Sequence, residues 1–376
     1  MKKNPEISII LPCRDEEQAL GFCLKEIKEV IKKSKLSAEI IVSDSSADKS
    51  PKIAKKHKVI LIKHNKEGYG AAYLEALKKA RGKYIFMADA DATYDFKEIP
   101  NFLNQLKNGQ DMVIGNRFAG RIEEGAMPFS NRCIGNPALS FILRLFFSAS
   151  INDSQSGMRA IKKQALLKLR LRTTGMEFAS EMIIKAIKNK LKIKEIPINY
   201  RKRKGKSKLR PYSDAWKHMR FMLIYSPLFL FFAPGFFLFL AGAVSMLWLY
   251  FGTPKLFGIN LFYHPMFFSS LLLITGYQLI TFSGFAKIYS ITHLGEKSRL
   301  FEKLFKYITI EKASALGGLV VLFGIAIFFI IIAKWLNSGL RELNEIKNSI
   351  VALTLIIAGI QTIFSSFMLS ILGIKK

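Results

Sequence analysis

The sequence contains little cysteine and little histidine for its size. Its three cysteines, Cys13, Cys23 and Cys133, are odd in number and lack the spacing of a metal site. We therefore expect reduced thiols in a cytosolic environment rather than a disulfide framework. The 5 histidines are scattered without ligand spacing, so we interpret them as non-catalytic.

Negative charge is also scarce: 28 acidic residues stand against 57 basic ones, a net charge of +29 at pH 7. Such an excess indicates a polyanionic partner, and the candidates are nucleic acid, an anionic membrane surface and phosphorylated substrates. The first residues, 1–6, lack the apolar core of a signal peptide. Long apolar runs begin only after about residue 221, so they favour the membrane, and we expect the chain before them to stay in the cytosol.

The first half of the chain alternates short apolar runs with helical patterns. The apolar runs predict strands at 7–11, 39–43, 59–62 and 84–88. Between the last two, a helix is expected from Ala72 to Ala80, stopped by Gly82. Alternation at this spacing predicts a parallel, doubly wound α/β sheet with right-handed crossovers.

Two carboxylates, Asp89 and Asp91, directly follow the strand at 84–88. Alternate side chains of an extended segment share a face, so the two can converge at the carboxyl edge of the sheet, where such folds bind ligands. Hard oxygen ligands suit Mg²⁺ or Mn²⁺ held together with substrate phosphates. The simpler alternative is a strand that ends in solvated acids, which a short motif by itself does not exclude.

Several stretches in the first half of the chain form a recognisable set: Leu11-Pro12 to Glu16, Asp44 to Asp48, Gly68 to Gly70 and Asp89-Ala90-Asp91. Together they resemble family 2 glycosyltransferases. A second set follows: Ile114 to Phe118, Gly125 to Pro128, Asn131 to Asn136, Asp153 to Arg159, Glu177 to Met182 and Arg203 to Leu209. It is similar to the polyprenyl-phosphate (dolichyl-phosphate) hexose synthases of that family, which have a membrane domain. This resemblance covers about residues 5–225; beyond them it rests on hydropathy.

The resemblance implies a GT-A type nucleotide-sugar-binding fold and an inverting, metal-dependent transfer of one hexose. The donor would be UDP-glucose or GDP-mannose, the acceptor polyprenyl or dolichyl phosphate, and the cofactor Mg²⁺ or Mn²⁺. A lipid monophosphate has a second pKa of about 6, so it is largely ionised at pH 7 without a catalytic base. The enzyme's task is then to position two polyanions and cancel their repulsion, which explains a site rich in Arg and Lys.

Carried over residue by residue, the resemblance assigns roles to three groups of side chains. Asp89 and Asp91 would hold the metal and diphosphate, Asp91 as the more direct ligand, and Arg117 and Arg132 would hold the acceptor phosphate by their guanidinium forks. Donor binding would involve Pro12, Arg14, Glu16, Asp44 (nucleoside), Gly68, Glu181, Arg203, Ser207 and Lys208. One departure is Thr93, where mannose synthases commonly carry Gln, which weakens the mannose assignment.

Simpler interpretations stand beside these roles. Arg117 follows a strand and is compatible with an ordinary surface position. Glu177 and Glu181 lie i, i+4 on a helix, as either a solvated face or, for Glu181, an acidic wall of the sugar pocket. Arg159 is interpreted as an ion-pair partner of Asp153 or Glu181.

Residues 201–210 carry seven basic residues in ten, followed by an amphipathic stretch with Trp216, Met219 and Leu223 at i, i+3, i+7. Because no nucleic-acid-binding signature accompanies them, we expect a membrane-surface element and no nucleic-acid partner. The predicted organisation is a cytosolic glycosyltransferase domain at 1–210, an interfacial helix at 211–227 and a membrane domain at 228–376.

Four apolar segments, at 228–251, 265–289, 313–333 and 350–372, each reach the about 20 residues that cross a bilayer. The connection from Lys287 to Lys312 is strongly basic, whereas 252–264 and 334–349 are not. The positive-inside rule thus predicts a multi-pass cell-membrane protein with its catalytic domain and both termini cytoplasmic. The spans contain no Asp or Glu, which argues against an ion-coupled transporter but leaves a plain anchor open.

Two other functions stay open at this point. One is a membrane glycosyltransferase for another lipid or a polysaccharide, although the chain has no Gln-x-x-Arg-Trp run and few spans for a polymer channel. The other is a non-catalytic lipid-binding scaffold, which the presence of Asp89, Asp91, Arg117 and Arg132 disfavours.

Overall fold

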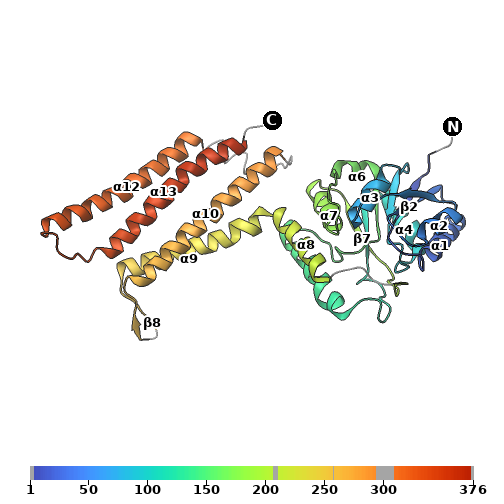
Figure 1. Cartoon of the computed structure of the whole chain (residues 1–376), viewed down its shortest axis with the longest axis horizontal. Helices are drawn as coiled ribbons and strands as arrows, with labels where there is room; N and C mark the ends of the chain where they lie inside the picture. The colour runs from blue at the N-terminus through green and yellow to red at the C-terminus, as the bar shows by residue number, and fades with distance from the viewer. Residues whose placement is uncertain (1–3, 206–210, 257, 294–308, 374–376) are drawn as a thin grey trace. The chain divides into compact units, whose positions relative to one another are not determined.

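The computed structural model describes residues 4–205, 211–256, 258–293 and 309–373. It divides the chain into two compact units, Met1–Tyr225 and Ser226–Lys376. Figure 1 shows an α/β unit and a helical unit. Each unit is described by itself below.

The first unit is built on a seven-stranded sheet in the order β3-β2-β1-β4-β6-β5-β7. The strands are β1 (Ile7–Cys13), β2 (Ala38–Asp44), β3 (Ile60–Lys63), β4 (Tyr84–Met87), β5 (Met112–Asn116), β6 (Arg159–Lys162) and β7 (Ile193–Pro197). Neighbours pair in parallel except for β6, which runs antiparallel to both β4 and β5. The mostly parallel α/β sheet confirms the predicted fold class.

Helices cover both faces of this sheet (Figure 1). The helical segments of this unit are α1 (Leu20–Lys33), α2 (Ser50–Lys56), α3 (Tyr69–Leu77), η1 (Phe96–Glu98), α4 (Ile99–Lys107), the π-helix η2 (Ser130–Gly135), α5 (Asn136–Phe147), α6 (Lys163–Leu169), α7 (Phe178–Lys188) and α8 (Pro211–Ile224). Because strand side chains alternate, Ile9 packs into one core with α1 and α4, and Ile10 packs into the other with α3 and α7. Burial on both faces explains why the strands are continuously apolar.

The carboxyl edge of the sheet gathers segments that lie far apart in the sequence. Strands β1, β2, β4 and β5 all end there, so the loops that follow them share this edge. Since β6 is antiparallel, its first residue, Arg159, pairs with Met87 of β4 and Ile114 of β5 at the same edge. The segment before β6 therefore reaches the loop that carries Asp89 and Asp91.

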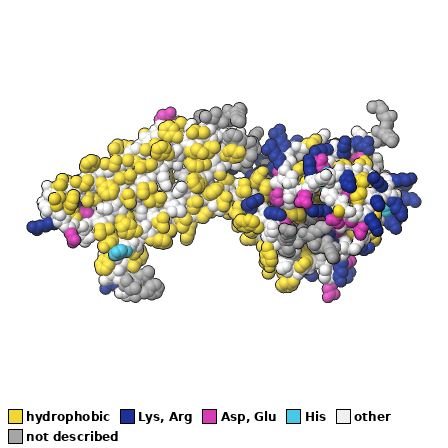
Figure 2. Space-filling model, viewed as in Figure 1, with side chains coloured by type: hydrophobic (Ala, Val, Ile, Leu, Met, Phe, Trp, Pro, Cys, Tyr) yellow, Lys and Arg dark blue, Asp and Glu magenta, His cyan; other side chains and the backbone are white. Residues whose placement is uncertain are grey.

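Among the residues that the structure describes, the second unit contains four helices that are long and apolar enough to cross a membrane, at Leu228–Phe251, His264–Thr292, Ile310–Asn337 and Ile346–Gly373. They correspond to η3 (Leu228–Phe232) with α9 (Ala233–Phe251), α10 (His264–His293), α12 (Ile310–Asn337) and α13 (Ile346–Gly373); β8 (Lys255–Leu256) and β9 (Ile259–Asn260) form a small hairpin. On the face shown in Figure 2, hydrophobic side chains predominate on this unit, whereas basic ones gather on the first. The four predicted spans are confirmed.

Glycines allow the membrane helices to approach one another closely. A side chain on Gly276 of α10 would collide with the backbone of Phe239 in α9, and one on Gly317 of α12 would meet the carbonyl of Gly359 in α13 at 2.8 Å. Ser270 and Thr354 join α10 to α13 through a hydroxyl pair at 2.7 Å. Small residues and interhelical hydroxyl bonds of this kind are how helices associate where no hydrophobic effect acts between them.

Candidate active site

Asp91 lies in the turn that follows β4. The turn is tight, because Ala92 adopts a left-handed conformation with φ of 66°. One carboxylate oxygen, Oδ1, accepts bonds from the backbone N and the hydroxyl of Thr93, at 3.1 and 2.6 Å. The other, Oδ2, accepts from Nη1 of Arg203 at 2.8 Å. Asp91 is only 6 % exposed. Through its two bonds to Oδ1, Thr93 orients this buried carboxylate.

Asp89 lies against a glycine and a tyrosine. A side chain on Gly157 would approach Asp89 Oδ2 to 2.6 Å, so this residue, two positions before β6, must be small for the carboxylate to fit. Burial and the negative charge of Asp91 raise the pKa of Asp89 to about 7, against the opposing effects of Arg203, the Tyr69 hydroxyl and Arg117. The two acids thus lie near enough to influence each other, an arrangement that favours a bound cation.

We call the turn that carries Asp89 and Asp91 the acidic turn. Residues 200–204, which we call the strap, lie along it. Arg201 N donates to Thr93 O at 2.8 Å and Lys204 N donates to Asp91 O at 3.0 Å. The Arg203 guanidinium bridges Asp91 and Glu16, which follows β1. The structure therefore brings Glu16, Asp91 and Arg203 together. Ser207 and Lys208 lie outside the described residues.

The predicted nucleoside residue, Asp44, ends β2 beside Cys13 of β1. It is fully buried; its Oδ1 accepts from the Ser46 hydroxyl at 2.6 Å, and its Oδ2 has no hydrogen-bond partner in the described part of the chain. A buried carboxylate oxygen without a donor is costly, so this oxygen suits a ligand N–H or O–H. In the loop that follows β1, Arg14 is exposed and pairs with Glu67 at 3.0 Å. Pro12 is part of β1 itself.

Gly68 and Glu181 contribute to the edge indirectly. Gly68, at φ 113°, has no room for a side chain beside the carbonyl of Thr174. Glu181 is 1 % exposed and accepts from Thr173 N at 2.9 Å, from the Thr173 hydroxyl at 2.6 Å and from Lys185 at 2.6 Å. Glu181 therefore belongs to neither a solvated face nor an open pocket wall. Through these bonds its buried carboxylate holds the loop that packs against Gly68.

Arg117 is not a surface residue, and its fork does not face outward. The side chain is 6 % exposed. Nε and Nη2 each donate to the buried carboxylate of Asp153 at 2.8 Å, and the guanidinium lies over the Tyr200 ring at 5.2 Å. Burial opposes the charge, but Asp153 outweighs it and raises the pKa of Arg117 above its usual value. The bidentate edge predicted to bind a phosphate is thus occupied by Asp153.

Arg132 lies in a different setting, exposed on the π-helix η2. Within the described residues it makes no side-chain hydrogen bond or ion pair, and none joins it to Arg117. Its neighbours Phe129 and Ile134 are exposed as well. The two arginines expected to act as a pair therefore differ: one is a buried half of an ion pair, and the other is an accessible cation among apolar side chains.

Two further side chains at this edge have roles that the sequence did not predict. Arg159 forms no ion pair with Asp153 or Glu181; it is buried and donates to three carbonyls, those of Ser154, Ser156 and Ala179. Tyr69 contacts Asp89 through its hydroxyl. The Gly68-Tyr69-Gly70 stretch gave a signal for Tyr69, whereas no local pattern marks the carbonyl cradle of Arg159.

The described residues include no group of three or more His, Cys, Asp or Glu side chains that could hold a metal by themselves. The acidic turn offers two carboxylates, Asp89 and Asp91. This set fits an ion such as Mg²⁺, which is commonly bound through one or two carboxylates together with substrate phosphates and water.

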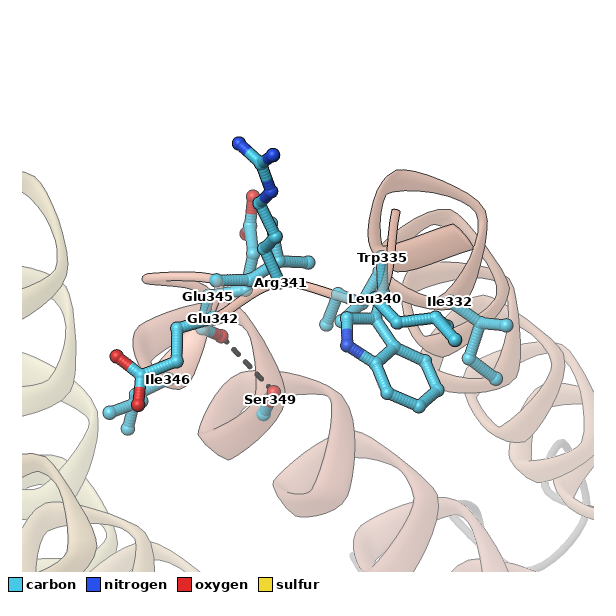
Figure 3. Close-up of a pocket in the computed structure, with 10 residues that line it drawn as sticks. Ile332, Trp335, Leu340, Arg341, Glu342, Glu345, Ile346 and Ser349 are labelled. Atoms are coloured by element: carbon cyan, nitrogen blue, oxygen red, sulfur yellow. Dashed lines mark hydrogen bonds between the residues drawn. The ribbon is translucent and has the colours of Figure 1, made fainter. Parts of the chain in front are cut away.

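A hollow of about 370 Å³ lies elsewhere, in the second unit, between the end of α12 and the start of α13. Figure 3 shows Trp335, Leu340 and Arg341 around it, with the Ser349 hydroxyl bonded to the backbone of Glu345 at 3.1 Å. The Glu345 carboxylate is paired with Lys334 at 2.7 Å. Its two acids, Glu342 and Glu345, lie in the connection between α12 and α13 and not at the carboxyl edge of the sheet, so we place the candidate site in the first unit.

A mostly parallel α/β sheet with two acids after its central strand and a set of four apolar helices lie in this one chain, and its family matches define it as a membrane-bound glycosyltransferase. Residues 8–170 match the model of glycosyl transferase family 2, and residues 284–373 match the glycosyltransferase family 2 C-terminal transmembrane region. The protein belongs to glycosyltransferase family 2 and is a multi-pass membrane glycosyltransferase.

Named relatives agree with this assignment. The chain is 36 % identical over 370 residues to a low-salt glycan biosynthesis hexosyltransferase of Haloferax volcanii, covering 98 % of this chain and 89 % of that protein. It is 31 % identical over 208 residues to a dolichyl-phosphate hexose transferase of the same organism, covering 55 % and 88 %. A dolichol-phosphate mannosyltransferase of Pyrococcus furiosus is 28 % identical over 215 residues, covering 54 % and 59 %.

Proposed function

We propose that this enzyme transfers a single hexose from a nucleotide-sugar to dolichyl or another polyprenyl phosphate at the cytoplasmic face of the membrane. The observation that carries the proposal is the convergence of Asp89, Asp91 and Arg203 at the carboxyl edge of the sheet, in a chain that continues into four membrane-spanning helices. The names of the relatives, which include dolichyl-phosphate and dolichol-phosphate sugar transferases, support the choice of acceptor.

The donor is assigned to the edge formed by β1, β2 and β4. Asp44 would accept a hydrogen bond from the nucleoside through its unpartnered Oδ2. Asp89 and Asp91 would hold Mg²⁺ or Mn²⁺, which when bound supplies charge neutralisation for the leaving diphosphate. Arg203 adds a guanidinium, whose planar fork matches phosphate oxygens. UDP-glucose and GDP-mannose are the donors we would test first.

The acceptor phosphate is assigned mainly to Arg132. This side chain is exposed and has no partner among the described residues, so it is free to bind an anion. Arg117 would contribute its charge without a bidentate bond, because Asp153 already holds Nε and Nη2. A lipid monophosphate needs no base to become a nucleophile near neutral pH, since its second pKa is about 6.

Two neighbouring helices of the first unit are suited to rest on the membrane. Helix α8 buries His218 and Met222 and leaves Tyr212 and Trp216 exposed, Tyr212 by 92 %. Helix α5, which packs against α8, exposes Phe141. Aromatic and aliphatic side chains of this kind, beside a basic segment, are typical of an interfacial helix, and they would keep Arg132 near the headgroups that carry the acceptor.

The proposal is tested with the full-length protein in lipid nanodiscs containing polyprenyl phosphate and a panel of labelled nucleotide-sugars. Label should enter the organic-extractable lipid with one donor. Asp91→Asn should abolish this transfer, while Asp111→Asn, an acid at the opposite end of the sheet paired with Lys162, should preserve it. Label in a water-soluble polymer would favour a polysaccharide acceptor, and no transfer from any donor would favour a non-catalytic scaffold.

A further inference from the structure

Asp91 already has a cationic partner in this structure. The Arg203 guanidinium donates from Nη1 to Asp91 Oδ2 at 2.8 Å and from Nη2 to Glu16. Only 22 % of the Arg203 side chain is exposed. A positive group thus stands at the carboxylate that we assign to the metal ion.

The backbone on either side of Arg203 delivers it to this position. Arg201 N bonds Thr93 O and Lys204 N bonds Asp91 O, so the strap is fixed to both sides of the acidic turn. The Arg201 side chain adds ion pairs to Glu26 at 3.0 Å and to Asp95 at 2.6 Å. Arg203 is therefore built into the site rather than resting on it by chance.

The guanidinium and a divalent cation compete for the same oxygen. Thr93 occupies Oδ1 of Asp91 with two hydrogen bonds, which leaves Oδ2 as the more open ligand, and Arg203 is bonded there. Mg²⁺ requires oxygens at about 2.1 Å in a near-ideal octahedron. A second cation on the same oxygen would repel it at short range.

The pairing also leaves Arg203 incompletely satisfied. Its Nε is buried and has no hydrogen-bond partner in the described part of the chain. A buried donor without an acceptor raises the free energy of this arrangement. An acceptor with several oxygens, such as a diphosphate, would satisfy the guanidinium better, because it can take bidentate bonds.

We propose that Arg203 is an exchangeable counter-ion of Asp91. It neutralises the carboxylate when no divalent cation is bound, leaves it when the cation binds, and turns to the diphosphate of the donor. The inference rests on the proposed metal-dependent function. It makes donor and cation binding mutually reinforcing, because the diphosphate gives the displaced guanidinium a new partner.

The test measures Mn²⁺ binding to the full-length protein without nucleotide, by electron paramagnetic resonance of the free ion. Arg203→Gln should bind Mn²⁺ about tenfold more tightly than the wild type, since a charge-assisted bond to Asp91 no longer has to be broken. Lys204→Gln is the matched control, because it removes one strap charge that lies over the Phe22 ring rather than on Asp91. Its affinity should stay within about twofold of the wild type.

Nucleoside diphosphate then provides a second measurement. UDP or GDP, whichever base matches the active donor, should tighten Mn²⁺ binding in the wild type and much less in Arg203→Gln. An unchanged or weaker Mn²⁺ affinity in Arg203→Gln, or an equal gain in Lys204→Gln, would overturn the exchange while leaving the metal site intact. If Asp91→Asn binds Mn²⁺ as tightly as the wild type, the metal site itself is wrong. Thermal unfolding of each variant checks that the fold is retained.

Discussion

Arg117 and Arg132 are the same residue type in opposite environments, and the difference determines what each substitution tests. Arg117→Ala leaves the carboxylate of Asp153 buried without a partner. Breaking a buried pair from one side typically costs about 3–5 kcal/mol. We therefore expect Arg117→Ala to lower the thermal unfolding midpoint of the first unit markedly, and Arg132→Ala, at an exposed position, to leave it nearly unchanged. Differential scanning fluorimetry in detergent measures both.

A double substitution separates charge from packing in this pair. Arg117→Gln with Asp153→Asn removes both charges together, so it should recover part of the stability that Arg117→Ala loses. An Arg117→Ala protein as stable as Arg132→Ala would show that the ion pair contributes nothing to the fold.

Catalytic efficiency should depend on Arg132, although the stability of the fold should not. Arg132→Ala should lower catalytic efficiency toward polyprenyl phosphate by about one to two orders of magnitude, because a charge-assisted bond is worth about 1.5–3 kcal/mol. Donor affinity, measured by calorimetry without acceptor, should not change. Arg132→Lys should restore only part of the loss, since it returns the charge without the fork. Loss of donor affinity in Arg132→Ala equal to that in Asp44→Ala would mean that donor and acceptor sites are wrongly divided.

His218 makes stability depend on pH. Burial, together with Arg159 and Lys217 and against Asp214, lowers the pKa of His218 to about 4, and its Nδ1 lies 2.8 Å from the Ser180 hydroxyl. The neutral ring stabilises the fold fully above the ordinary pKa of 6.5. This contribution is lost as the pH falls from there to about 4, because only the unfolded chain takes up the proton.

The expected loss at pH 5 is about 2 kcal/mol. The unfolding midpoint of the wild type should therefore drop further between pH 7.5 and pH 5 than that of His218→Gln, whose amide can still bond Ser180. Equal drops in the two proteins would show that His218 is not buried in its neutral form.

The site residues that could be predicted from the sequence are those marked by a pattern of neighbouring residues. Asp89 and Asp91 directly follow a strand, so their position at the carboxyl edge of the sheet was predictable, although they converge in the turn after β4 and not on an extended segment. The partner of Arg117 was not, because Asp153 lies 36 residues further along the chain. The buried role of Glu181 was not predicted, for a similar reason: its helical spacing suits a solvated face or a pocket wall, and only the loop folded over it shows that its carboxylate is buried.

At the scale of elements, the first four strands, β1 to β4, were predicted from the sequence, whereas the reversed strand β6 and the parallel strand β7 were not. Strands β1, β2 and β4 are continuous apolar runs between turn signals. Strand β6 has four residues, two of them basic, and pairs antiparallel between β4 and β5. Direction and position in a sheet arise from long-range pairing, which a short local pattern does not encode.

The helices α5 and α8 permit a prediction about membrane contact. Phe141→Ser on α5 should lower transfer to long-chain polyprenyl phosphate in nanodiscs and leave transfer to a short, water-soluble prenyl phosphate nearly unchanged, because it removes apolar contact with lipid without changing the donor edge. Leu167→Ser on α6 is the control, since Leu167 is also exposed but belongs to another helix. If Phe141→Ser lowers transfer to the long-chain and the short-chain acceptor equally, the side chain acts within the catalytic unit and not through contact with the membrane.

At the scale of the whole molecule, the distribution of charge predicts the orientation in the membrane. Basic residues concentrate between Lys287 and Lys312, and the connection that contains Ser338 carries few. By the positive-inside rule, Ser338→Cys should react with an impermeant maleimide in intact cells, whereas Cys133 should react only after permeabilisation. The opposite pattern would reverse the four-span topology and place the first unit outside.

The order of the segments in the first unit has a consequence for its synthesis on the ribosome. Every strand of the seven-stranded sheet lies at or before Pro197, and the first candidate span begins only at Leu228. Since domains generally fold as units from the N-terminus during synthesis, the sheet and its acidic turn can assemble before any membrane helix has been made. The strap follows the last strand, so Arg203 reaches Asp91 late. A nascent chain that pauses between the two carries the acidic pair without its guanidinium, and would bind divalent cations more readily than the finished enzyme.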